Sequence, residues 1–142
     1  MTDPKRIAIV PCSGIGKTSG TVSREAAYEV TEDLRPDRTR IIALSLLVLG
    51  DEAARAAVVD NPAITIDGCK LACATKVCQV RAGRVAQVFD VMDTYRRNRQ
   101  LKSQGIAELN EDGKKLAHAL AEEICEAVDR LTAAKKGKQD NA

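Results

Sequence analysis

The chain has 142 residues, and its 22 Lys and Arg residues against 20 Asp and Glu residues leave a formal net charge of +2. This balance gives no electrostatic reason to expect a nucleic-acid or anionic-membrane partner. With one Phe, two Tyr and no Trp, the chain also lacks the stacking surfaces that bind single-stranded nucleic acid. The length suits one domain that buries roughly two-thirds of the surface exposed by its unfolded form.

The N-terminal residues show no export signal. MTDPKR leads into only four apolar residues, which is too short for the apolar region of a signal peptide, and no later run approaches a membrane span. We therefore expect a soluble cytoplasmic protein without a membrane partner. Five cysteines in a reducing compartment are not expected to form a disulfide framework, so metal binding or thiol chemistry is indicated instead.

The first half of the chain predicts a strand, a helix and a second strand. Arg6–Val10 is a short apolar strand, and Ser23–Leu34 carries apolar residues at helical spacing. Pro36 ends that helix, because the residue before a proline avoids the helical region. Arg40–Leu49 is almost continuously apolar, which is typical of a strand buried on both faces.

The next elements continue the alternation. Asp51 can cap a short alanine-rich helix that Asn61–Pro62 closes. Ala63–Asp67 is predicted to be the third strand, and Arg84–Val91, which follows Gly83, the fourth.

The C-terminal part predicts one long helix. Glu108–Leu131 carries an apolar stripe, made by Leu116, Leu120, Ile124, Val128 and Leu131. Before it, residues 94–103 collect four basic residues without an acid, and we expect this segment to face solvent. We assign residues 1–134 to a single α/β metal-binding domain and residues 135–142 to a disordered basic tail.

Strands that alternate with helices predict an α/β fold with a small parallel sheet of about four strands and helices on its flanks. Right-handed crossovers in a doubly wound arrangement place the strands in the order 2-1-3-4. The crevice between strands one and three is then the topological switch point, where open sheets of this kind bind ligands beyond the carboxyl ends of their strands.

Cysteines follow both of those strands. Cys12 comes directly after strand one, and Cys69 follows strand three, with Cys73 and Cys78 close behind. If Gly68 starts a helix, Cys69 and Cys73 lie on one face of it. Four thiolates complete a tetrahedral zinc shell. Soft thiolates also suit an iron–sulfur cluster, so the spacing leaves the metal open.

The opening loop also allows other interpretations. PCSGIGKT differs from a phosphate-binding loop in having Pro11 at the first glycine position. Ser13, Gly14, Gly16 and Lys17 are then candidate cofactor-binding residues, whose amides would hold an anion at a helix start. Pro11 weakens this interpretation, because proline lacks the amide and has a fixed backbone angle.

A third possibility is a thiol enzyme for sulfur transfer or reduction with Cys12 as nucleophile, although no acid–base partner is evident. The remaining candidates are better explained by structure. Cys125 flanks the apolar stripe of the last helix and is expected in the core. His118 falls on the other side of that helix from Leu116 and is expected to be exposed.

The segments PCSGIGK and IDGC, with further cysteines after the second, resemble the DGC domain family of small prokaryotic proteins, named for its Asp-Gly-Cys motif. The resemblance covers roughly Ile7 to Asp93. It implies zinc binding and carries over to Cys12, Asp67, Gly68, Cys69 and Cys73, leaving Cys78 in question. It implies no reaction, substrate or protein partner, so whether the chain is an enzyme stays open.

Overall fold

The computed structural model describes residues 6–140, with side chains described from residue 6 to residue 134. The sequence predicted that residues 135–142 are disordered. The side chains of these residues are not described, so this stays a prediction. Four parallel strands form one sheet in the order β2-β1-β3-β4, as the sequence predicted. The strands are β1 (Ile7–Pro11), β2 (Thr39–Ile41), β3 (Ala63–Asp67) and β4 (Gln87–Asp90).

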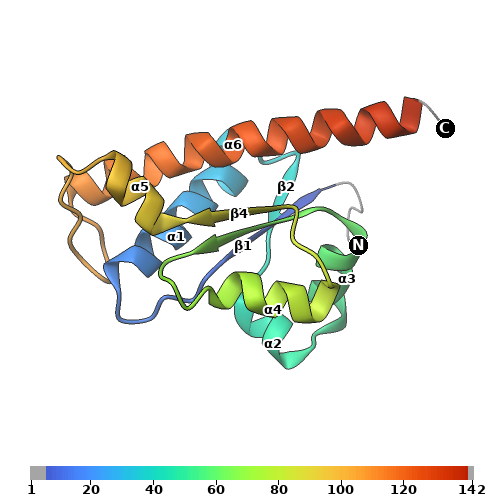
Figure 1. Ribbon diagram of the computed structural model, residues 1–142, viewed down its shortest axis with the longest axis horizontal. Coiled ribbons are helices and arrows are strands. Elements are labelled where there is room, and N and C mark those ends of the chain that lie inside the picture. The colour runs from blue at the N-terminus through green and yellow to red at the C-terminus, as the bar shows by residue number, and fades with distance from the viewer. Residues whose placement is uncertain (1–5, 141–142) are drawn as a thin grey trace.

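Helices cover both faces of this sheet (Figure 1). One face carries α1 (Thr18–Tyr28), the π-helical segment η1 (Glu29–Leu34), α5 (Val91–Arg97) and the long α6 (Glu111–Asp140). The other carries α2 (Leu44–Leu49), α3 (Glu52–Asp60) and α4 (Cys73–Ala82). In the described part of the chain, no helix combines the length and the apolar character needed to cross a membrane.

The central strand β1 shows why the sheet needs two layers of helices. All five of its residues are buried, and alternate side chains point to opposite faces of a strand. Ile7 and Ile9 accordingly pack in the core beneath α1 and α6, whereas Ala8 and Val10 pack in the core beneath α2, α3 and α4. Cys12, the next residue of this alternation, belongs to the second core.

The second predicted strand is corrected by the structure. Only Thr39–Ile41 pairs with β1, and the last six residues of the apolar run form helix α2. Leu44 and Leu47 of this helix are buried while Val48 and Leu49 are exposed, so the run is not buried on all sides. A short apolar run cannot be assigned to strand or helix by periodicity alone.

Helix α1 begins five residues earlier than predicted, directly after the glycine loop. It passes without a break into η1, where the Arg35 amide donates to the Val30 carbonyl at 2.8 Å. The predicted stop before Pro36 is confirmed.

The remaining elements agree with the sequence in part. Helix α5 was not predicted, and it takes up the start of the 94–103 segment that was expected to face solvent, with Thr94 buried. Asp51 caps α3 by accepting a hydrogen bond from the Ala54 amide at 3.0 Å, and β3 has its predicted bounds. Strand β4 is shorter than Arg84–Val91. Helix α6 starts three residues later than Glu108, and the first four residues of its predicted stripe, Leu116, Leu120, Ile124 and Val128, are buried in the core.

Candidate functional site

A pocket of about 300 Å³ lies beyond the carboxyl ends of β1 and β3. This is the switch point where ligand binding is expected in an open parallel sheet. The loops after the two strands meet at the left edge of the molecule in Figure 1. Three of the predicted metal ligands line the pocket, namely Cys12, Cys69 and Cys73.

The glycine loop folds back onto the first turn of α1. Gly14 and Gly16 adopt positive φ angles of 55° and 83°, a conformation that side chains with a Cβ disfavour. A Cβ on Gly14 would lie 2.2 Å from the Cα atom of Gly20. The turn is closed by a hydrogen bond of 3.2 Å from the Lys17 amide to the Gly14 carbonyl. The glycines thus bring the loop against the helix start.

Gly68 makes room for the Cys12 sulfur. A Cβ at this position would lie 3.1 Å from Cys12 Sγ and 3.2 Å from the Gly20 amide nitrogen. The Gly68 amide donates to Cys12 Sγ at 3.2 Å. The φ angle of Gly68 is not among the positive ones, so its backbone conformation does not call for a glycine. The structure instead requires a glycine for close packing.

Burial shapes the chemistry of Cys12. The residue is 7% exposed, and the burial raises the pKa of its thiol above the ordinary value. Hydrogen bonds with Ser23 and with the Gly68 amide oppose this rise in the pKa of Cys12, while the nearby acidic groups of Asp67 and Cys69 add to it. A raised pKa keeps the isolated thiol protonated at neutral pH, which disfavours Cys12 as a free thiolate nucleophile.

Asp67 serves the fold of the next helix. Its buried carboxylate accepts hydrogen bonds from the Ala74 amide at 3.0 Å, from the Thr75 amide at 3.3 Å and from the Thr75 hydroxyl at 2.5 Å. These donors lie in the first turn of α4, whose own N-cap residue, Ala72, has no side-chain cap. With its oxygens engaged in this way, Asp67 is not free to hold magnesium as in a phosphate-binding site.

The segment between β3 and α4 corrects the predicted placement of two cysteines. Helix α4 begins at Cys73 and not at Gly68, so Cys69 and Cys73 do not lie four residues apart on one helix. Cys69 instead occupies a turn in which the Ala72 amide donates to its carbonyl at 3.1 Å. Ala72 has a φ angle of 52°, which is unusual for a residue other than glycine. Both cysteines still face the pocket.

Cys78 lies elsewhere. It is fully buried in the core beneath α2, α3 and α4, and its thiol lies 3.7 Å from the Arg84 carbonyl, to which it donates. It is not among the residues that line the pocket. Across the described side chains, no three His, Cys, Asp or Glu residues form a ready-made metal group. The pocket therefore collects three thiols without holding them in a finished coordination shell.

Three of the four candidate cofactor-binding residues line the pocket. Ser13, Gly14 and Lys17 line the pocket, whereas Gly16 does not. The structure also adds Arg24 of α1, whose guanidinium donates to the Ser13 carbonyl. No local sequence pattern predicts this contact, because it depends on the loop folding back over α1.

Two further expectations concern α6, and both are confirmed. Cys125 is buried in the core beneath α1 and α6, where it acts as a small apolar side chain. The His118 side chain is 53% exposed and contacts Glu29 and Glu122.

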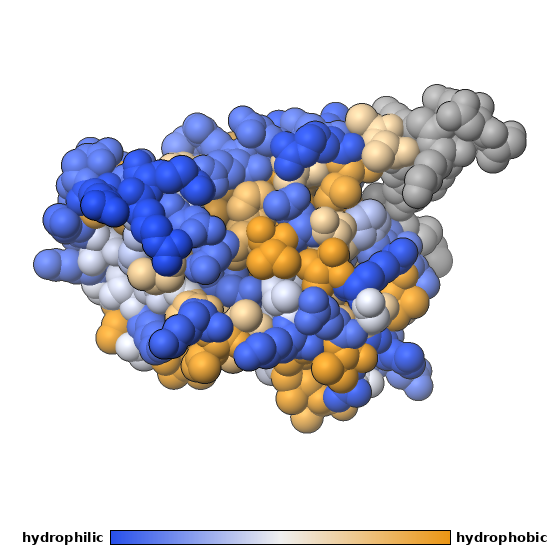
Figure 2. All heavy atoms as spheres, viewed as in Figure 1, coloured by the Kyte–Doolittle hydropathy of each residue, from blue (hydrophilic) through white to orange (hydrophobic). Residues whose placement is uncertain are grey.

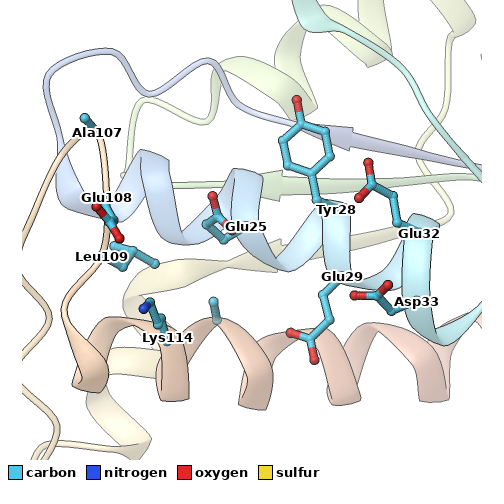
Figure 3. A pocket seen from close by; sticks show the side chains of 10 residues that line it. Glu25, Tyr28, Glu29, Glu32, Asp33, Ala107, Glu108, Leu109 and Lys114 are labelled. Atoms are coloured by element: carbon cyan, nitrogen blue, oxygen red, sulfur yellow. The ribbon is translucent and has the colours of Figure 1, made fainter.

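A second, acidic pocket lies between η1 and the start of α6. It has a volume of about 430 Å³, and Figure 3 shows four acidic side chains from α1 and η1, of which Glu29 points toward α6. No cysteine lines it, and Lys114 is its one cation among the described lining residues. Three of the four cysteines predicted as ligands, Cys12, Cys69 and Cys73, thus belong to the other pocket.

Comparison with known proteins supports the resemblance seen in the sequence. The family model described as DGC domain matches residues 8–128, which is most of the chain. No curated protein matches the chain. No solved structure matches it either.

Proposed function

The chain belongs to the DGC domain family, and we propose that it binds a zinc ion through Cys12, Cys69 and Cys73. The observation that carries this proposal is that three thiols from two separate segments line one pocket at the switch point of the sheet. Thiolates are preferred ligands of zinc and of other soft metals. Bound zinc would supply a charge that favours the deprotonated thiols.

The donor chemistry fits zinc, and the three cysteines differ in how firmly they are held. Cys12 is fixed by its burial and by the Gly68 amide. Cys69 lies in the turn before α4, and Cys73 is exposed at the first position of that helix. Since metal binding commonly completes the folding of its own ligand loop, we propose that residues 69–73 adjust around the ion while Cys12 stays in place.

The first prediction concerns the identity of these ligands. Replacing Cys12, Cys69 or Cys73 by Ser should weaken zinc binding more than about tenfold, since even the outer partners of metal ligands cost that much. Cys125→Ser is the matched control, because Cys125 lies in the other core; it should keep full zinc content. Zinc per chain, measured by elemental analysis after dialysis, gives the result.

Cys78→Ser separates a closed from an open site. Since Cys78 does not line the pocket, we expect the variant to retain its zinc. Loss of zinc in a folded Cys78→Ser protein would instead indicate a four-thiolate site formed by rearrangement of α4. Unchanged zinc content in both Cys12→Ser and Cys69→Ser would refute the proposed site.

The visible absorption spectrum of anaerobically purified protein distinguishes the alternative metal. A colourless protein with one zinc per chain supports the proposal, whereas a brown protein that contains iron and labile sulfide would show that the same thiols hold an iron–sulfur cluster. An unassisted thiol enzyme is disfavoured because burial raises the pKa of Cys12. We assign no reaction to the site.

A further inference from the structure

We propose that the cysteine pocket also receives a small organic thiol that carries a carboxylate, as the fourth ligand of the bound metal ion. This inference rests on the proposed function. Zinc takes four ligands in tetrahedral sites, and the pocket offers three cysteines. The question is therefore what occupies the remaining position.

The described part of the chain offers no obvious fourth ligand. Cys78 is buried in the core away from the pocket and donates to a backbone carbonyl. Asp67 caps α4 with both carboxylate oxygens. Cys125 and His118 belong to α6, which covers the opposite face of the sheet (Figure 1). The fourth ligand is thus expected from outside the chain.

The size and walls of the pocket indicate more than a water molecule. Its volume of about 300 Å³ is roughly ten times the share of one water in the liquid. Ile15, Leu44 and Leu71 contribute apolar walls beside the polar Ser13, Lys17 and Ser19. Ile15 and Leu71 are 90% and 57% exposed, and Figure 2 shows apolar surface at this end of the molecule. An organic body would cover these side chains.

The charge of the pocket lining indicates which group the other end of the ligand carries. Among the described residues that line the pocket, Lys17 alone carries a charge. A carboxylate on the ligand would pair with this ammonium group, while a sulfur atom would satisfy a metal that already has thiolate ligands. Binding is a simple exchange. The thiol would lose its proton to solvent as its sulfur binds the ion that Cys12, Cys69 and Cys73 would hold, and nothing would be oxidised or reduced.

The experiment titrates zinc-loaded protein, purified without added thiol, with three probes in a calorimeter. We expect 3-mercaptopropionate to bind most tightly, 2-mercaptoethanol to bind more weakly because it lacks the carboxylate, and 3-hydroxypropionate not to bind because it lacks the sulfur. Cobalt-substituted protein provides a second readout, since a fourth thiolate intensifies the sulfur-to-metal absorption band.

Pocket variants locate the bound thiol. Lys17→Gln should lower the affinity for 3-mercaptopropionate by about threefold, which is the effect of losing an exposed ion pair. It should leave the affinity for 2-mercaptoethanol unchanged. Leu71→Ser should weaken both thiols by about fivefold through lost apolar contact. Val80→Ser is the matched control, because Val80 is an exposed apolar residue of α4 that does not line the pocket; it should change neither affinity.

Failure of this inference differs from failure of the proposed function. Parent protein that binds no zinc overturns both. Zinc-loaded protein that does not respond to the thiols, or that merely surrenders its zinc to them in equilibrium dialysis, overturns the inference alone. A zinc-dependent dimer in light scattering would also overturn it, because a second copy would then supply the fourth ligand.

Discussion

The position of Cys12 depends on the residue opposite having no side chain. Gly68 donates its amide to the sulfur at 3.2 Å, and a Cβ there would approach the sulfur to 3.1 Å. The Asp-Gly-Cys motif therefore combines three separate tasks. Asp67 caps α4, Gly68 makes room for the sulfur from the other strand, and Cys69 faces the pocket. Only the third of these tasks was predicted from the sequence.

A prediction at the same scale uses Gly68→Ala. The added methyl group must displace Cys12 Sγ or the start of α1, so we expect unfolding to become easier by about 1–3 kcal/mol and zinc affinity to fall. Gly83→Ala is the control. Its φ angle of +75° makes an alanine strained, but no atom lies within 4 Å of the new Cβ, so it should lose stability and keep zinc. Thermal melts measure the change in stability, and elemental analysis measures the zinc content. Normal zinc binding by a folded Gly68→Ala protein would contradict the packing argument.

At the scale of elements, the junctions were harder to predict than the elements themselves. Strand β3 and the cap of α3 follow from local residues, and the sequence predicted both. The start of α4 depends on the Asp67 carboxylate, which accepts hydrogen bonds across the turn from the amides of Ala74 and Thr75. No local sequence pattern predicts these hydrogen bonds. The split of the 40–49 run into β2 and α2 likewise depends on which apolar side chains the rest of the fold covers.

The bond between η1 and α6 gives a prediction for pH. Arg35 follows η1 and donates from two nitrogens to the Asp129 carboxylate, each at 2.9 Å. This hydrogen bonding to Arg35 lowers the pKa of Asp129 below its ordinary value. A lowered pKa adds stability above the unfolded-state pKa of about 4, and this contribution is lost as the pH falls through the folded-state value.

Asp129→Asn should therefore reduce stability at pH 7 by less than about 1 kcal/mol, since the pair is partly exposed. The difference from the parent should stay constant from pH 7 to pH 5 and shrink below about pH 4. Urea unfolding at several pH values measures it. Glu111→Gln is the control, because its contact with Lys114 is an exposed pair within α6. A difference that grew in acid would show that the sign is wrong.

At the scale of the whole molecule, the predicted strand order was the most useful step in locating the site. The rhythm of strands and helices, with right-handed crossovers, was enough to place Cys12 and Cys69 at one pocket. The same reasoning did not place Cys78, because whether a helical cysteine faces a pocket or the core depends on the rotation of the helix. That rotation is set by packing against α2 and α3, which the sequence does not specify.

The last prediction tests the whole molecule against its two candidate ligands, zinc and a magnesium nucleotide. A ligand that binds only the folded state raises the melting temperature by mass action. Zinc should raise it in the parent protein and not in Cys12→Ser. Magnesium with ATP or GTP should leave it unchanged, because Asp67 is engaged in capping α4 and Pro11 has no amide to offer a phosphate. Lys17→Ala is the informative variant, since Lys17 would contact the phosphates in a nucleotide site. A magnesium-dependent rise in the parent that disappears in Lys17→Ala would mean that the glycine loop binds a phosphate, and it would count directly against the thiol pocket as the principal site.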